Sequence, residues 1–245
     1  MKRLGGLLIL ASALGCAPAA PPPPEQATRP PSGPKVSATV LTIRESSHPP
    51  TRAFLHKVVI AGAKVRLGDE KDQWRLFDLE ARTVTWVDDV AKTYRTVTLG
   101  ELLRARERQL RARIPTAGVR PLSVRADEEA REIGGVPARR MVFEMGGYRR
   151  ELWLSQEPLA GPLFLRMFVA SEPLSEPWAG VMRDAQRALM NAQGFPVVDR
   201  SRLTWEGGEL LFERQLVRIQ KRDVPAEWVT IPADYRDVTV AAKKK

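Results

Sequence analysis

Closely spaced β-rich runs after residue 34 constrain the fold of this chain more than any other feature. They are rich in Val, Thr, Ile and aromatic residues and are separated by Gly, Asp-Glu or Asp-Asp turns. Their spacing of about 8–12 residues is typical of an antiparallel meander, because a parallel pair needs a longer crossover connection. The predicted strands of this first set span residues 36–45, 53–61, 63–67, 73–79, 82–88 and 92–98.

The hydrophobic period changes from strand to helix at residues 99–113. One face of this predicted helix carries leucines, and the other carries arginines. The leucines are Leu99, Leu102, Leu103 and Leu110, and the arginines are Arg104, Arg106, Arg108 and Arg111. An arginine face of this kind is most often solvated. Attraction to anionic lipid or to a cell-wall polymer is the alternative.

The second half of the chain again combines strands and helices. A short apolar helix is expected at residues 161–170, and a longer helix at 175–193 is expected to stop at Gly194. The apolar residues at helical spacing in the longer helix are Trp178, Val181, Met182, Ala185, Leu189 and Met190. Strands are expected at 122–127, 128–135, 136–145, 148–155, 195–205 and 209–220. This order of about eleven strands with two or three helices predicts one α+β domain built on a curved antiparallel sheet.

The N-terminal segment has the features of an export signal. Residues 1–16, MKRLGGLLILASALGC, combine a charged start with an apolar stretch too short to cross a bilayer of about 30 Å as a helix. The sole cysteine, Cys16, lies where cleavage would fall, and the segment resembles the lipobox of bacterial lipoproteins, whose cysteine is acylated. The alternative is an ordinary secretory signal with an incidental cysteine. Residues 17–34 hold 8 of the 20 prolines and predict an extended tether.

Half of the net charge of +10 comes from the two ends of the chain. Lys2 and Arg3 belong to the predicted signal, and Lys243–Lys245 form a basic tail. Residues 17–242 retain a charge of only +5. Nucleic-acid binding needs a strongly basic face with stacking aromatic residues, so we do not expect it here.

Signals for catalysis or for a metal site are sparse. The sequence has no G-x-S-x-G, H-E-x-x-H, P-loop or EF-hand pattern. Of its two histidines, His48 lies in a turn beside Pro49-Pro50 and His56 lies in a predicted strand, so neither is expected on a helix with a carboxylate one turn away. A single cysteine excludes a disulfide scaffold. We therefore expect no enzyme activity, no metal site and no cofactor.

Ordered motifs make the chain similar to the LolA/LolB-like envelope lipoprotein domains. The first half shares with them Gly62, Lys64, Arg66, Asp78, Leu79, Thr83, Asp88, Lys92, Thr93 and Tyr94. The second half shares Gly135, Glu151 and Trp153, the run QGFPV at 193–197 and the run WVTIPADY at 228–235. The resemblance implies an unclosed β-barrel of about eleven strands, capped by helices, around an apolar cavity for acyl chains.

These features together predict the organisation and location of the protein. Its predicted parts are a signal peptide at 1–15, a lipidated Cys16 and tether at 16–34, a LolA/LolB-like domain at 35–240 and a basic tail at 241–245. By analogy with enteric bacteria, Ala17 in place of Asp favours the periplasmic face of the outer membrane over the inner membrane. We expect a monomer that its lipid anchor attaches to the membrane.

The function implied by the resemblance is binding of an acyl chain, a lipid or another lipoprotein in the apolar cavity, without catalysis. The candidate cavity residues are Trp86, Leu102, Trp153, Trp178, Met182 and Leu189. The alternative is a structural or interaction module that docks an envelope protein through an outer face or a sheet edge. An enzyme ranks third and would require polar residues clustered deep in the cavity.

Overall fold

The structure, a computed structural model, describes residues 33–48, 52–68, 72–112, 123–145, 147–157, 159–172 and 183–239. The predicted signal peptide, Cys16, most of the tether and the basic tail lie outside these residues. Within the described ranges, no helix combines the length and the apolar character that crossing a membrane would require.

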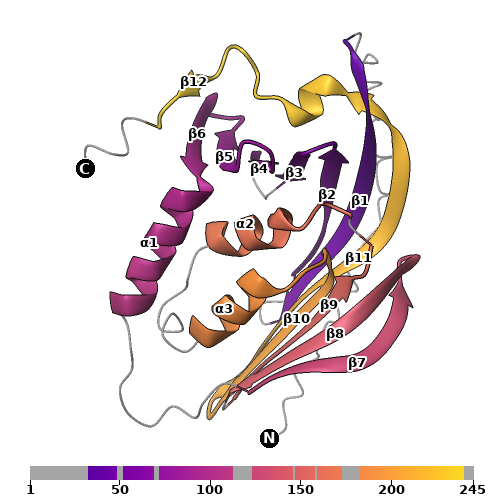
Figure 1. The fold of residues 1–245 in the computed structure, drawn as a ribbon, viewed down its shortest axis with the longest axis vertical. Coiled ribbons are helices and arrows are strands. Elements are labelled where there is room, and N and C mark those ends of the chain that lie inside the picture. Colours follow the sequence, from indigo (N-terminus) through magenta and orange to yellow (C-terminus); the bar gives the residue numbers. More distant parts are fainter. Residues whose placement is uncertain are drawn as a thin grey trace, which may run out of the picture. The chain divides into compact units, whose positions relative to one another are not determined.

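Two antiparallel meanders make up the domain, with helices inserted between and within them (Figure 1). The strands of the first are β1 (Lys35–His48), β2 (Arg52–Ala61), β3 (Lys64–Gly68), β4 (Gln73–Asp78), β5 (Thr83–Asp88) and β6 (Thr93–Thr98). The strands of the second are β7 (Ser123–Ile133), β8 (Val136–Met145), β9 (Tyr148–Ser155), β10 (Pro196–Trp205) and β11 (Gly208–Pro225). The helices are α1 (Leu99–Ala112), α2 (Leu163–Ser171) and α3 (Arg183–Asn191). The last elements of the described residues are the 3-10 helix η1 (Ala226–Val229) and the short strand β12 (Arg236–Asp237).

All the strands of the described residues join in one sheet, in the order β12-β6-β5-β4-β3-β2-β1-β11-β10-β9-β8-β7. The long ladder between β1 and β11 unites the two meanders, and the pairing is antiparallel except between β12 and β6. Because β12 and β7 end the order without pairing to each other, the sheet remains open. The predicted α+β class and the unclosed, helix-capped sheet are confirmed. The sheet has twelve strands, because the runs expected at 122–127 and 128–135 form one strand and β12 adds a two-residue edge.

A β-bulge interrupts the ladder between β1 and β11. Thr42 lies opposite Arg218 and Ile43 lies opposite Leu216, so Val217 has no partner in β1. The Val217 side chain is 52% exposed. A bulge bends the strand that carries it and increases the local twist, so the sheet curves at this point.

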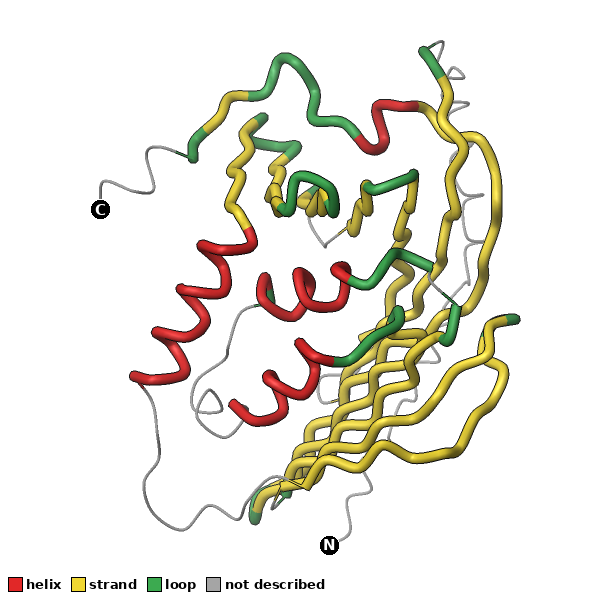
Figure 2. The backbone as a smooth tube through the Cα atoms, viewed as in Figure 1, coloured by secondary structure: helices red, strands yellow, loops and turns green. Residues whose placement is uncertain are grey.

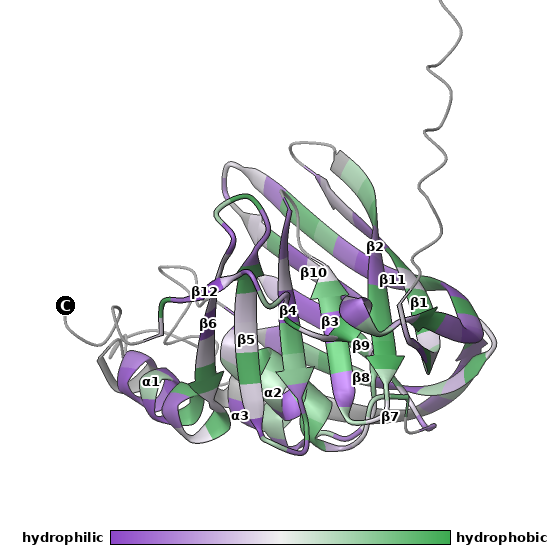
Figure 3. Ribbon diagram, turned by 90° about the horizontal axis from the view of Figure 1, so that it is seen from above, coloured by the Kyte–Doolittle hydropathy of each residue, from purple (hydrophilic) through white to green (hydrophobic). Residues whose placement is uncertain are grey.

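The inner face of the sheet packs against the helices, which lie together on one side of it (Figure 2). The apolar helix α2 provides most of this contact, since Arg166 is its one exposed residue. A helix that is apolar on all sides is suited to burial rather than to a surface. The helix α1, by contrast, is largely hydrophilic (Figure 3).

The outer face of the first meander packs against the C-terminal segment, residues 226–239. Trp74 of β4 and Val229 of η1 belong to one buried cluster there. Asp89 accepts hydrogen bonds from Trp74 Nε1 at 2.8 Å and from the Tyr235 hydroxyl at 3.0 Å. The Arg66 guanidinium lies 4.0 Å from the Trp74 ring centroid, on its face. Both faces of this part of the sheet are therefore buried.

Several element boundaries differ from the sequence-based expectation. The strand β11 extends to Pro225 rather than to residue 220. The runs at 122–127 and 128–135 form one strand, β7, whose register shifts between Ala126 and Ala130. Of the helix predicted at 175–193, the described residues include only the part from Arg183 onward, which forms α3. This helix ends at Asn191 rather than at Gly194. Gly194, with φ of +110°, instead forms the turn that leads into β10.

We predict that Gly194→Ala destabilises the domain more than Gly135→Ala. Both glycines have positive φ, which an alanine adopts at a cost of about 1–2 kcal/mol. A Cβ on Gly194 would also lie 2.4 Å from the Ser155 carbonyl oxygen, whereas a Cβ on Gly135 meets nothing within 4 Å. Because of this added overlap, urea unfolding should show that Gly194→Ala lowers the free energy of unfolding by about 3 kcal/mol or more. Equal losses for the two variants would contradict the close approach.

Candidate functional site

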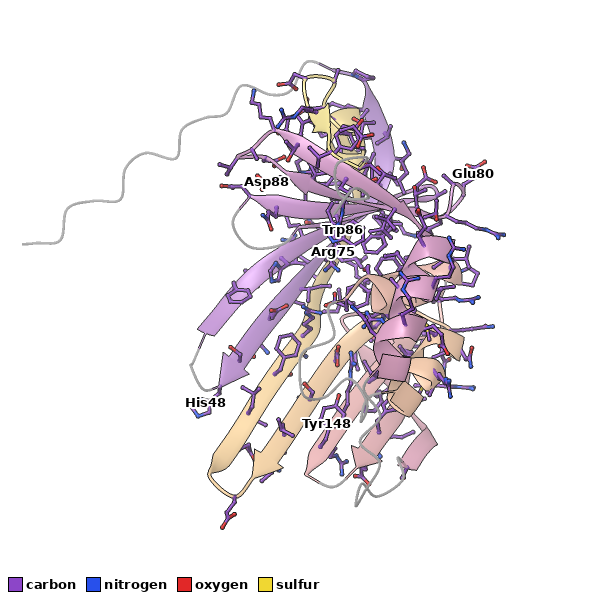
Figure 4. The ribbon with its side chains drawn as sticks, turned by 90° about the vertical axis from the view of Figure 1, so that its left-hand side faces the viewer. His48, Arg75, Glu80, Trp86, Asp88 and Tyr148 are labelled. Atoms are coloured by element: carbon purple, nitrogen blue, oxygen red, sulfur yellow. The ribbon has the colours of Figure 1, made fainter. Side chains whose placement is uncertain are left out.

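A cavity of about 320 Å³ lies between the inner face of the sheet and α2. Seven strands and one helix bound it, so it draws on both meanders. Its lining residues are Ile43, Glu45, His56, Val58, Leu67, Gly68, Arg75, Trp86, Phe164, Phe168, Ser171, Glu172, Phe195, Pro196, Asp199 and Arg214. Figure 4 shows Arg75 and Trp86 close together between the first meander and the helices.

Aromatic rings form the apolar wall beneath α2. The Phe164 ring stacks on Phe195 with centroids 5.2 Å apart, and Phe77 meets Phe164 edge-on at 5.2 Å. Phe168 continues this set, with its centroid 5.8 Å from that of Phe164. Such contacts orient the rings as well as burying them, so this wall has a defined shape.

The lining also contains charged groups that the apolar expectation did not include. Three ion pairs lie in or directly behind it. They are Arg75–Glu172 at 3.0 Å, Arg150–Asp199 at 2.6 Å and Arg214–Glu45 at 2.5 Å. Strand register explains the last pair, because Glu45 of β1 lies directly opposite Arg214 of β11. The site therefore combines an aromatic and aliphatic lining with three ion pairs.

The buried arginines Arg150 and Arg214 of these ion pairs remain charged. Burial by itself lowers the pKa of Arg150, but the charge of Asp199 and the hydrogen bonds to it outweigh that effect and raise the pKa. Burial likewise acts to lower the pKa of Arg214, and the charges of Glu172 and Glu45 more than offset it, so this pKa is also raised. Each guanidinium is therefore a fixed positive charge with a carboxylate beside it.

The two histidines occupy different places. His48 lies exposed at the end of β1, away from the cavity (Figure 4). His56 lines the cavity, and its buried Nε2 lies 3.5 Å from Glu45 Oε2 without a hydrogen bond to any described residue. In the described ranges, no three His, Cys, Asp or Glu side chains are grouped as metal ligands would be.

The six candidate cavity residues fall into three groups. Trp86 lines the cavity. Leu102, Trp153 and Leu189 are buried in the packed inner cluster and are not among the cavity-lining residues. Trp178 and Met182 lie outside the described residues. The predicted attachment site, Cys16, lies outside them as well.

Two arginines from opposite sides hold the C-terminal end of α2. Arg75 donates to Ser171 Oγ at 3.3 Å and to Glu172 Oε1 at 3.0 Å. Arg106 of α1 donates to the carbonyl oxygens of Val169 at 3.0 Å, of Ala170 at 3.3 Å and of Glu172. The final carbonyls of a helix lack intrahelical partners and carry partial negative charge, so both cations stabilise this end.

Arg106 corrects the expectation of a solvated arginine face on α1. Arg104 and Arg108 are exposed as predicted, whereas Arg106 is only 3% exposed. Its burial lowers its pKa, and the charge of Glu172 opposes that shift. The spacing contains the signal, because Arg106 follows Leu99, Leu102 and Leu103 by seven, four and three residues and so shares their face.

We predict that Arg106→Met lowers the free energy of unfolding by about 2–4 kcal/mol, since it removes charge-assisted hydrogen bonds to several buried carbonyls. Arg108→Met, on the exposed side of the same helix, should change it by less than about 0.5 kcal/mol. Thermal and urea unfolding of the two variants measure the difference. Similar stability of both variants would mean that Arg106 does not hold α2.

Comparisons with known proteins gave weak structural overlaps and no sequence match. No protein-family model matches the chain, and no curated protein matches it. A structure of PNGF-II in the C2 space group overlaps with a TM-score of 0.46 and 8% identity, over 85% of this chain and 32% of that one. The structure of MucB in complex with MucA(peri) overlaps with a TM-score of 0.36 and 17% identity, over 84% of this chain and 58% of that one. The LolA superfamily protein NE2245 from Nitrosomonas europaea overlaps with a TM-score of 0.29 and 10% identity, over 80% of this chain and 91% of that one.

This chain spans about a third of the PNGF-II chain and somewhat more than half of the MucB chain. At TM-scores below 0.5, these overlaps support no inference about function. Function also does not follow from fold alone, so the chemistry of the cavity has to carry it.

Proposed function

We propose that this domain is a non-catalytic binding module that takes an acyl chain into the cavity between its sheet and α2. The observation that carries the proposal is the cavity itself, about 320 Å³ beneath an aromatic wall. Small-molecule pockets span about 300–1,000 Å³, so the volume suits a single slender ligand.

A hydrocarbon chain matches the apolar part of the lining. This part comes from flat aromatic rings and from aliphatic side chains such as Ile43 and Val58. Burial of each methylene contributes about 0.8 kcal/mol, and part of this gain is lost to immobilisation of the ligand. The hydrogen bonds from Arg75 and Arg106 to the C-terminal end of α2 hold this helix beside the cavity.

The polar groups of the cavity favour binding over catalysis. Each lining carboxylate is paired with an arginine. The Ser171 hydroxyl donates to the Phe168 carbonyl oxygen at 2.8 Å and so has no base to activate it. A nucleophile with an adjacent general base is therefore missing from the described lining residues.

The proposed setting is the bacterial envelope, on the periplasmic face of the outer membrane. The supporting observations are the short apolar leader that ends at Cys16 and the proline-rich segment after it. Acylation of Cys16 would anchor the chain, and the segment at 17–34 would separate the domain from the bilayer.

We predict that Val58→Phe reduces the affinity for N-phenyl-1-naphthylamine, a neutral fluorescent apolar probe, at least tenfold. Val58 is fully buried and lines the cavity, so a larger side chain occupies the space of the ligand. Leu55→Phe is the matched control, because Leu55 lies on the same strand and is 66% exposed. Circular dichroism would establish that both variants fold. Failure of the unchanged protein to bind the probe would favour the alternative of partner docking through a sheet edge such as β7.

We predict that Cys16 carries the lipid anchor. Mass spectrometry of the detergent-extracted protein should show a mature chain that begins at Cys16 with the mass of attached acyl chains. Cys16→Ser should lack this mass and should leave the membrane fraction. A mature wild-type protein with an unmodified Cys16 would exclude the anchor and support an ordinary secretory signal.

A further inference from the structure

A second hollow lies at the margin of the sheet, where β6 leads into α1 (Figure 1). We call it the edge groove. It has a volume of about 480 Å³, and its lining includes Arg95 of β6, Arg104 and Arg108 of α1, and Thr239. None of the residues that line it also lines the cavity beside α2. Its binding properties are therefore independent of the proposed function.

Local hydrogen bonds fix the corner that shapes the edge groove. Thr98 and Glu101 cap the start of α1 reciprocally. Thr98 Oγ1 accepts from the Glu101 amide at 3.2 Å, and Glu101 Oε2 accepts from the Thr98 amide at 3.0 Å. At the edge of β6, the Thr96 amide donates to Thr239 Oγ1 at 3.0 Å. The backbone of the groove is therefore held in place by the protein itself.

Three positive charges meet in the edge groove without neutralisation. Arg95, Arg104 and Arg108 are exposed, and no carboxylate of the described residues forms an ion pair with any of them. Glu101 is the one acid among the lining residues, and its carboxylate accepts hydrogen bonds from the amide and the hydroxyl of Thr98. Three guanidinium groups and one carboxylate leave the lining with a net charge of +2.

The placement of the arginines makes this charge available to a ligand. Arg104 and Arg108 are four residues apart in α1 and share a face, where like charges destabilise a helix. Strand register sets Arg95 opposite Trp86 of β5, and its guanidinium carbon lies 5.0 Å from the Trp86 ring centroid. This contact with the ring orients the guanidinium. An anion bound among the three side chains would relieve the repulsion between them.

A phosphate monoester matches both the charge and the donors of the edge groove. A guanidinium group presents a planar fork of N–H donors that binds phosphate oxygens in pairs. A phosphate monoester carries a charge of about −1.5 to −2 at pH 7, which balances the +2 of the lining. A carboxylate or a phosphodiester has a single negative charge and leaves half of it uncompensated. The volume of about 480 Å³ also leaves room for the organic group that carries the phosphate.

We propose that Arg95, Arg104 and Arg108 form a binding site for the phosphate monoester of a ligand in the edge groove. The site binds and does no chemistry on the phosphate. A phosphate monoester occurs both on soluble compounds and on lipid headgroups, and the test separates these two sources.

The first test compares ligands that differ in the charge of one group. Isothermal titration calorimetry would use the full mature protein in a neutral detergent, at low salt and about pH 8, where a monoester with a second pKa of about 6 is fully ionised. The ligands are glycerol 3-phosphate, dimethyl phosphate and glycerol. Glycerol 3-phosphate should bind at least tenfold more tightly than dimethyl phosphate, and glycerol should not bind. Similar affinities for the two phosphates would overturn the selection of monoesters.

The second test uses the same protein and detergent with the phosphate on a lipid. Micelles that contain phosphatidic acid, which is a phosphate monoester, are compared with micelles that contain phosphatidylcholine. Binding of glycerol 3-phosphate alone assigns the site to a soluble ligand, and binding of phosphatidic acid alone assigns it to a lipid headgroup. Binding of both shows that the phosphate itself is recognised. Binding of neither would overturn the proposal.

Substitutions locate the bound phosphate. Arg95→Gln, Arg104→Gln and Arg108→Gln should each weaken the binding of the monoester at least fivefold. Arg166→Gln is the matched control, because Arg166 is exposed on α2 and lies outside the groove, so the same net charge is lost. It should change the affinity by less than twofold. An equal loss in all four variants would mean that only the overall charge attracts the ligand and would overturn the site. Circular dichroism would establish that these exposed substitutions leave the fold intact.

Discussion

The hydrogen bonds that two arginines donate to the C-terminal end of α2 are the interaction on which the cavity depends. Nearly every side of α2 is apolar, so this helix has no solvent face that could fix its orientation. Arg75 reaches it from β4, and Arg106 reaches it from α1. Both cations meet the end where the helix dipole is negative. The aromatic stack that Phe164 forms over the cavity follows from that placement.

Local patterns predicted the class and order of the fold because they depend on neighbouring residues. The strand spacing in the first meander leaves space only for antiparallel hairpins, and the structure has them. The start of α1 at Leu99 also follows from its period. The sequence pattern predicts two strands where the structure has the single strand β7. The register of β7 shifts between Ala126 and Ala130, and this irregularity interrupts the alternation that identifies a strand.

The cavity was beyond the reach of the same patterns. Periodicity assigns Leu102 and Leu189 to a buried face, but it does not say whether the space opposite that face is filled, and here it is. Glu45 and Arg214 are 169 residues apart in sequence, so no local signal connects them. Arg106 is the exception, since its position in the leucine stripe indicated burial and only its charge argued against it.

Burial on both faces explains the composition of the first meander. Four successive residues of β4, Trp74 to Phe77, are buried. An antiparallel sheet with one wet face would alternate instead. Here Arg75 and Phe77 face α2, while Trp74 and Leu76 face the C-terminal segment. Residues 226–239 therefore cover the outer face of the same sheet that forms the floor of the cavity.

The bulge at Val217 affects the curvature of the sheet without changing which side chains line the cavity. Val217 is the one residue of this ladder segment that β1 leaves without a partner, so a chain that lacked it could keep Ile43 opposite Leu216 and Glu45 opposite Arg214. The same side chains would still point inward along a straighter ladder. Gain or loss of one residue at this position is thus a route by which related chains could enlarge or narrow the chamber while keeping its chemistry.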